Sequence, residues 1–219
     1  APVAMVITKH FVVLHMPKTG GIFMEEVCRQ HLPNDWLVCN SFHRHAPWEE
    51  IPEDYRGLPV FYLVRNPWDW YVSWFDHVLR GRRDFPYKED KPFWQTAFAA
   101  GANDFKQTIV NACTGNVAHE LTPIGDRDYF SARFFWIGGQ GLADGRIEVG
   151  KFESMHDDFL AFFERHQIPI PDSFATALRE TRRMNVGERG PYRSYYDEET
   201  RDLVGEKTRE IVERWGYEF

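Results

Sequence analysis

The sequence predicts an α/β fold in which helices flank a central parallel sheet of four or five strands. Two observations indicate this fold. Short runs of Val, Phe, Leu and Tyr are apolar at every position, as strands buried on both faces are, rather than at alternate positions. Segments with helical spacing separate these runs, which is typical of strand–helix–strand units. We therefore expect parallel strands whose carboxyl ends lead into helix N-termini.

The first of these runs, residues 11–15, is a predicted strand, and the apolar residues Phe23, Met24, Val27 and Cys28 follow it at helical spacing. Two further strands are predicted at 36–39 and 60–64. The sequence "NPWDWYVSWFDHVLRG" (66–81) then predicts a helix that Asn66 caps, Pro67 opens and Gly81 ends. Both strand-to-helix junctions are predicted to be sharp.

The second half of the chain is less regular. Residues 82–146 begin with a polar loop, followed by one or two helices over 93–113. After this variable region, the patterns predict a strand at 146–152, a helix at 154–166, a loop at 185–193 and a helix at 197–215.

The size and charge of the chain restrict its function. With 219 residues, 43% of them hydrophobic, the chain can bury one sizeable core, so we predict a single domain over residues 1–219. A net charge of -7 argues against nucleic acid as a partner. The apolar runs near the start are broken by Lys9 and His10 and predict no membrane span. The oligomeric state is left open.

Cysteine usage indicates a reducing, cytoplasmic setting. Cys28, Cys39 and Cys113 are odd in number, which argues against a disulfide framework. Neither they nor the carboxylates have the spacing of a zinc site, so no metal is expected.

The segment Met-Pro-Lys-Thr-Gly-Gly (16–21), after the first predicted strand, is suited to hold an anion. A glycine turn at the carboxyl end of a strand lets backbone N–H groups and a helix N-terminus converge on a phosphate-like group. Lys18 adds a positive charge. The loop of kinases and GTPases, GxxxxGK[ST], places its lysine after the glycines, whereas here the lysine comes first. The alternative is an ordinary turn with an exposed lysine.

A second anion site is predicted at the next junction, where Arg65 ends a strand and Ser73 follows on the helix. Such an arginine can bind a phosphate through charge-assisted hydrogen bonds. Taken singly, Arg65 could form a structural ion pair and Ser73 could pack against another helix. Taken together, the two junctions can hold both ends of a bisphosphorylated nucleotide.

These motifs resemble those of sulfotransferases. "HMPKTGG" resembles their 5′-phosphosulfate loop, and "VRNPWDWYVSWF" is similar to their 3′-phosphate motif. In this second motif, Arg65 and Ser73 occupy the positions of the arginine and the serine that bind the 3′-phosphate in the family. "VGKFESMHDDF" resembles the family's strand-and-acid element. "NVGERGPYRSYYDEETRDLV" and the final "WGYEF" resemble the C-terminal loop and helix of carbohydrate-type and related bacterial members. The resemblance covers about residues 11–80 and 146–219.

The resemblance implies a P-loop-like fold, 3′-phosphoadenosine 5′-phosphosulfate (PAPS) as donor, 3′-phosphoadenosine 5′-phosphate (PAP) as product, and no metal. The nucleotide-binding residues that it implies are Lys18, Thr19, Gly20, Gly21, Ile22, Phe23, Arg65, Ser73, Arg189, Gly190 and Arg193. Ile22 departs from the Ser or Thr of many members. "ERG" replaces a more basic triplet of cytosolic members, so Arg189 with Gly190 competes with Arg193 for the 3′-phosphate.

The segment "FHRHAP" (42–47) contains two candidate bases. In an extended segment His43 and His45 point to the same face. As a metal site the pair lacks further ligands, and both residues could serve in packing. The resemblance implies a third interpretation, because family members place their general base here. We expect His45 to be the base, with His43 as the second candidate, and Lys18 to assist catalysis.

The acceptor site is less defined. The aromatic residues that could line it, or could instead belong to the core, are Trp68, Trp70, Trp74, Phe93 and Trp94. The basic runs at 80–83 and 179–183 are solvated helix ends or docking places for an anionic acceptor. We expect the variable region 82–146 to shape the acceptor site.

The sequence thus predicts an enzyme that moves a sulfuryl group in line from PAPS to an acceptor hydroxyl, or less favourably an amine, of a small molecule or carbohydrate. One alternative is a P-loop kinase, which needs Mg²⁺ and a GK[ST] loop that the sequence lacks. Another alternative is a non-catalytic nucleotide-binding module. The presence of both Lys18 and His45 argues against it.

Overall fold

The computed structural model describes residues 5–38, 45–84, 104–114, 125–180 and 189–219. By its internal contacts the chain divides into two compact units, residues 1–65 with 137–186 and residues 66–136 with 187–219. The predicted α/β fold class is confirmed by a sheet whose strands alternate with helices. The single domain over 1–219 stays a prediction.

The sheet of the first unit contains four strands in the order β1 (Val6–Ile7), β2 (Val12–Val13), β3 (Val60–Val64) and β4 (Ile147–Lys151). The strands β2, β3 and β4 run parallel, as predicted. Every residue of β3 is buried, which explains its unbroken apolar run. The parallel arrangement brings the carboxyl ends of β2 and β3 to one edge of the sheet.

The strand β1 was not predicted, and it pairs antiparallel with β2. A tight turn joins the two strands, in which the Thr8 hydroxyl donates to the Phe11 carbonyl at 2.8 Å and accepts from the Phe11 N–H at 2.9 Å. So short a connection permits an antiparallel pair, whereas a parallel pair needs a longer crossover. The predicted parallel sheet therefore has an antiparallel strand at this edge.

The predicted strand at 36–39 is also wrong within the described residues. The 3₁₀ helix η1 (Asn34–Trp36) takes its place, closed by a hydrogen bond from the Trp36 N–H to the Pro33 carbonyl at 2.9 Å. Leu37 then forms an isolated antiparallel bridge to Thr8. Pro33 fixes the backbone dihedral that starts this turn, and apolar content at 36–39 reflects burial beside the sheet edge rather than a strand.

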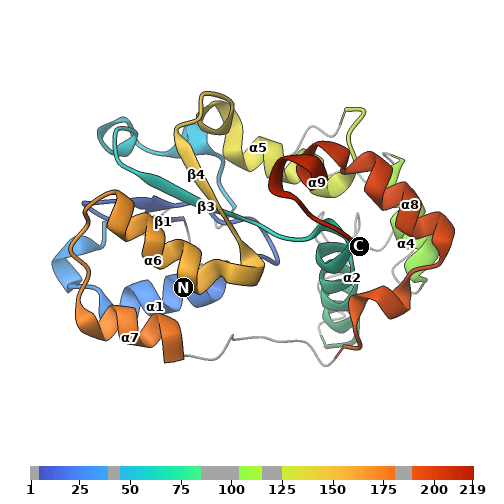
Figure 1. Cartoon of the computed structure of the whole chain (residues 1–219), viewed down its shortest axis with the longest axis horizontal. Coiled ribbons are helices and arrows are strands. Elements are labelled where there is room, and N and C mark those ends of the chain that lie inside the picture. The colour runs from blue at the N-terminus through green and yellow to red at the C-terminus, as the bar shows by residue number, and fades with distance from the viewer. Residues whose placement is uncertain (1–4, 39–44, 85–103, 115–124, 181–188) are drawn as a thin grey trace. The chain divides into compact units, whose positions relative to one another are not determined.

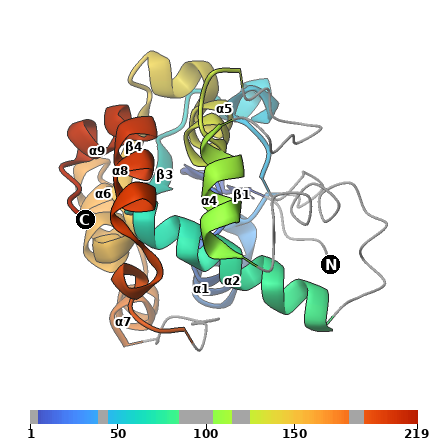
Figure 2. The ribbon, with the colours of Figure 1, turned by 90° about the vertical axis from the view of Figure 1, so that its right-hand side faces the viewer.

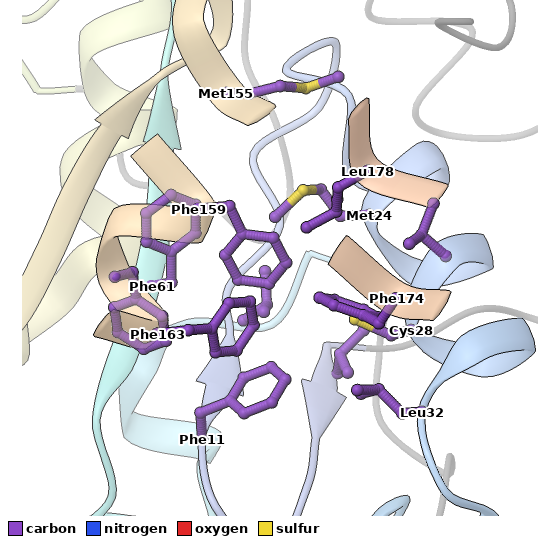
Figure 3. Close-up of a cluster of buried hydrophobic side chains, with 14 of the residues drawn as sticks. Phe11, Met24, Cys28, Leu32, Phe61, Met155, Phe159, Phe163, Phe174 and Leu178 are labelled. Carbon is purple, nitrogen blue, oxygen red and sulfur yellow. The ribbon is translucent and has the colours of Figure 1, made fainter. Parts of the chain in front are cut away.

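The core of the first unit lies between the sheet and the helices α1 (Gly21–His31), α6 (Met155–Arg165) and α7 (Asp172–Glu180), which gather beside the sheet in Figure 1. Figure 3 shows phenylalanine rings from strand and helix in contact. The ring centroids of Phe61 and Phe159 lie 4.8 Å apart, and those of Phe11 and Phe163 lie 5.0 Å apart. Each such buried ring contributes roughly 1.5–3 kcal/mol. This packing fixes the start of α1 and of α6.

The predicted strand at 146–152 and helix at 154–166 are confirmed as β4 and α6, joined by the 3₁₀ helix η5 (Phe152–Ser154). The helix α7 was not predicted. The first unit also contains the 3₁₀ helices η2 (Trp48–Glu50) and η3 (Glu53–Tyr55).

The second unit is helical and contains α2 (Pro67–Asp84), α4 (Phe105–Cys113), α8 (Glu198–Lys207) and α9 (Arg209–Trp215). The helix α4 lies beside α8 in Figure 2 and also packs on α2. The helix α5 (Tyr129–Ala143), which was not predicted, crosses the boundary between the units and is broken at Gly139, where φ is 51°.

The predicted cap of α2 is confirmed: the Asn66 side-chain oxygen accepts from the N–H groups of Trp68 at 3.0 Å and Asp69 at 3.3 Å. The predicted stop at Gly81 is wrong, because α2 continues to Asp84. A single interior glycine costs a helix only about 1 kcal/mol, which does not by itself end it. The helix predicted at 197–215 is two helices that meet at Thr208.

Within the residues for which the structure gives a conformation, no helix combines the length and the hydropathy that a membrane span requires.

Candidate functional site

The turn between β2 and α1 has an unusual backbone. Lys18 has a φ of 65° and Gly20 a φ of 82°, both in the left-handed region. For a residue with a side chain this conformation costs about 1–3 kcal/mol, so the surrounding structure must hold it. Thr19 lies between them with 1% of its surface exposed, and its hydroxyl donates to the Met16 carbonyl at 2.8 Å. The buried threonine thereby closes the turn.

The two glycines of this turn are needed because their backbone lies against neighbouring side chains. A Cβ atom added to Gly21 would lie 1.9 Å from Cδ2 of the His15 ring. One added to Gly20 would lie 2.9 Å from the sulfur of Met155. Packing on both sides therefore excludes larger residues.

The turn leads into the first turn of α1, where backbone N–H groups have no intrahelical acceptor. The first intrahelical hydrogen bond of α1 runs from the Met24 N–H to the Gly20 carbonyl at 3.1 Å. The N–H groups of Gly21, Ile22 and Phe23 precede that bond and are the free donors of the first turn. Gly20 provides no side-chain cap for them, and Ile22 is 38% exposed. These donors, the helix dipole and the Lys18 ammonium suit an anion.

Arg65 supports the Lys18 turn from the neighbouring strand. It directly follows β3, is 6% exposed, and donates from Nη1 to the Lys18 carbonyl at 2.6 Å. Its guanidinium carbon lies 4.1 Å from the centre of the Phe152 ring. A Cβ added to Gly20 would come within 3.3 Å of that same ring. Arg65, Phe152 and the turn thus form one packed group at the carboxyl ends of the parallel strands β2, β3 and β4.

His45 is half-buried, and its Nδ1 atom lies 3.0 Å from the His15 carbonyl oxygen. A carbonyl can only accept, so Nδ1 carries the proton and Nε2 holds the lone pair of the neutral ring. The two imidazole centroids are 4.7 Å apart, and the His15 ring in turn packs on Gly21. His15 thereby connects the candidate base to the first residue of α1. His43 lies outside the described residues.

In the second unit, Ser73 on α2 is 9% exposed. Asp69 precedes it by one helical turn and accepts from Nη2 of Arg189 at 2.5 Å. The other C-terminal candidate, Arg193, is exposed and donates to the Phe219 carbonyl at 2.8 Å. Gly190 is exposed as well. Of the two competing arginines, Arg189 is the one whose side chain bonds to a residue of α2.

No protein-family model and no curated protein matches the sequence. Solved structures do match it, and 11 chains are similar. In one of them, mouse sulfotransferase SULT7A1 complexed with PAP, the TM-score is 0.54 at 16% identity over 95% of this chain and 88% of that chain. The chain has the sulfotransferase fold. The P-loop-like fold that the sequence motifs implied is thereby confirmed.

On this sulfotransferase fold, three of the tryptophans suggested for the acceptor site belong to the core. Trp70 and Trp74 are 0% and 2% exposed and stack with centroids 6.0 Å apart. Trp68, 6% exposed, donates from its indole nitrogen to the Arg201 carbonyl at 2.9 Å. The packing interpretation is correct for these three. Phe93, Trp94, residues 181–183 and the side chains of 80–83 lie outside the described residues.

The cysteines of the described residues take no part in the site. Cys28 and Cys113 are buried and unpaired, and burial raises the pKa of both thiols well above its usual range. Neither side chain is therefore a thiolate near neutral pH. Cys39 lies outside the described residues. No group of three or more His, Cys, Asp or Glu with metal-binding geometry occurs in the part of the chain that the structure describes.

Two residues of the site were not predicted. His15 ends the apolar run 11–15, and its place at the carboxyl end of a predicted strand was the signal that could have identified it. Phe152 follows β4 directly. Nothing in its local sequence indicates that its ring supports a turn more than a hundred residues earlier.

Proposed function

We propose that this chain is a PAPS-dependent sulfotransferase that transfers a sulfuryl group to an acceptor hydroxyl. The observation that carries the proposal is the lysine-first turn, in which Lys18 adopts a φ of 65° and Arg65 holds its carbonyl. The sequence motifs and the sulfotransferase fold support the same activity.

The residues of the turn fit a phosphosulfate. The donor set consists of the Lys18 ammonium and the first N–H groups of α1, all of which donate hydrogen bonds to oxygen. Gly20 and Gly21 have no side chains to keep an anion away from this backbone. A P-loop kinase would instead need the GK[ST] sequence, which is absent.

The bound nucleotide would supply the activated sulfuryl group, and the chain would supply position and charge. The N–H groups of residues 20–23 hold the 5′ end of the nucleotide, and the hydrogen bond from Thr19 to the Met16 carbonyl maintains the shape of the turn. The Lys18 ammonium neutralises the negative charge that develops on the leaving oxygen as the bond to sulfur breaks. Arg65 and Ser73 remain the proposed contacts of the 3′-phosphate, as the sequence resemblance implies.

His45 would act as the general base. Its Nε2 atom takes the proton of the acceptor hydroxyl while its Nδ1–H group continues to donate to the His15 carbonyl. This hydrogen bond keeps the ring in the tautomer and orientation that the transfer needs. The oxygen freed of its proton attacks sulfur in line, opposite the leaving nucleotide oxygen.

The acceptor is proposed to be a small molecule or carbohydrate that presents a hydroxyl, with an amine as the second possibility. A cytoplasmic location is part of the proposal, which the unpaired, buried thiols of Cys28 and Cys113 support.

Calorimetry with PAP in the presence of EDTA tests the proposed function. Binding is expected without a divalent ion, because Lys18 and the backbone N–H groups provide the positive charge. Lys18→Ala should weaken it about tenfold to a hundredfold, the range for a lost charge-assisted contact. Lys9→Ala is the matched control, since Lys9 forms an exposed ion pair with Asp35 and should leave affinity unchanged. Binding that requires Mg²⁺ would contradict the proposal and favour a kinase.

A further inference from the structure

Arg189 is held in place by a carboxylate of the helix that carries Ser73. The Arg189 and Asp69 side chains are 16% and 17% exposed, and their charged groups meet at 2.5 Å. Asp69 and Ser73 are four residues apart on α2, so they lie on one helix face, with Cβ atoms roughly 5–6 Å apart. Ser73 therefore lies on the same face of α2 as Asp69, the residue that binds Arg189.

The backbone on both sides of this ion pair is fixed. Asn66 accepts from the Asp69 N–H at 3.3 Å, which sets the first turn of α2. On the other side, the Tyr196 hydroxyl donates to the Trp68 carbonyl at 2.8 Å and ties the segment after Arg189 to the same turn. Arg189 is thus anchored at its guanidinium and, seven residues later, along its chain.

The geometry leaves the guanidinium able to bind a second anion. An arginine carries five N–H donors in a planar fork, and Asp69 engages it through one nitrogen, Nη2. A carboxylate on one nitrogen fixes the plane of the fork while the remaining donors can meet phosphate oxygens. Arg193, by contrast, is exposed and donates from Nη2 to the main-chain oxygen of Phe219 rather than to a residue of α2.

We propose that Asp69 is a positioning residue that orients Arg189 on the Ser73 face of α2 for the 3′-phosphate of the nucleotide. The proposal rests on the proposed function, and it assigns the 3′-phosphate to Arg189 rather than to Arg193. Asp69 does not touch the nucleotide in this account; it acts through the arginine.

A double-mutant cycle measured by calorimetry tests the proposal, with PAP and 5′-AMP as the two probes. Arg189→Ala should weaken PAP binding by about tenfold to a hundredfold, as expected for a lost charge-assisted contact. Asp69→Ala should weaken it by about threefold to tenfold and leave 5′-AMP binding nearly unchanged. The double variant should bind PAP no more weakly than Arg189→Ala, because Asp69 has nothing left to orient.

Two further variants keep the test decisive. Asp69→Asn retains an oxygen that can accept from Arg189, so it should recover part of the affinity even if Asp69→Ala folds poorly. Arg127→Ala is the matched control, because Arg127 is an exposed arginine of the same unit that pairs with Glu210, and it should bind PAP like the wild type. Arg193→Ala tests the competing assignment and should weaken PAP binding less than Arg189→Ala.

The positioning role is overturned if Asp69→Ala tightens PAP binding, which would mean that the carboxylate competes with phosphate. It is also overturned if the variant weakens PAP and 5′-AMP equally, or if the effects of the two single variants add. In each of these cases the wild-type protein still binds PAP, so only the positioning role fails. If the wild-type protein does not bind PAP at all, the proposed function itself is refuted.

Discussion

His45→Ala is expected to slow sulfuryl transfer by about 10²–10⁴-fold, the usual value of general-base assistance. An acceptor hydroxyl is a poor nucleophile until its proton can leave, and a neutral imidazole accepts protons near neutral pH. The hydrogen bond from Nδ1 to the His15 carbonyl places the lone pair on Nε2. PAP affinity should stay nearly unchanged, because the residues proposed to bind the nucleotide do not include His45.

Single-turnover transfer to a working acceptor measures this effect, paired with PAP calorimetry for each variant. His45→Asn is the informative companion, since its amide nitrogen takes the place of Nδ1 and can still donate to the His15 carbonyl but is not basic. His45→Asn should transfer the sulfuryl group about as slowly as His45→Ala. His43→Ala should reduce the transfer rate by less than His45→Ala does. A nearly full rate in His45→Ala would place the base elsewhere, with His43 next, and joint loss of folding and PAP binding would assign His45 to packing.

Arg65→Ala is expected to weaken PAP binding by about tenfold to a hundredfold and 5′-AMP binding by less. Only PAP carries the 3′-phosphate that Arg65 is proposed to meet. A smaller loss for 5′-AMP is expected as well, because the substitution removes the donor to the Lys18 carbonyl at 2.6 Å and loosens the turn. The ratio of the two losses separates the two roles of the arginine.

Calorimetry with both nucleotides gives that ratio, and Arg65→Lys refines it. Lysine keeps the charge but loses the planar fork that reaches a carbonyl and a phosphate together. Its PAP affinity should lie between those of the wild type and Arg65→Ala. Equal losses for PAP and 5′-AMP in Arg65→Ala would contradict the 3′-phosphate role and leave Arg65 as a support of the turn.

The features that the sequence predicted well have local causes. The cap by Asn66, the opening Pro67 and the buried run 60–64 are written in adjacent residues, and the structure reproduces them. The strand β4 and the helix α6 were predictable for the same reason. Because strand, turn and helix are contiguous, the residues of the lysine-first turn could also be predicted from the sequence alone.

The features that were not predicted depend on contacts between distant residues. The strand β1 is two residues long and is defined by its pairing with β2, not by a pattern of its own. Phe152 becomes part of the site because parallel pairing of β3 and β4 brings its ring to Arg65. The contact of Arg189 with Asp69, on which the proposed choice of Arg189 over Arg193 rests, joins residues 120 positions apart in the sequence.

Transfer of a labelled sulfuryl group from PAPS in EDTA tests the central claim most directly. The wild-type protein is incubated with the donor and with phenolic, carbohydrate and amine acceptors in turn. We predict that label reaches at least one hydroxyl acceptor and that His45→Ala abolishes most of this transfer without loss of PAP binding. If PAP binds but no acceptor of any class gains label, the chain is a nucleotide-binding module without the chemistry, and the claim fails.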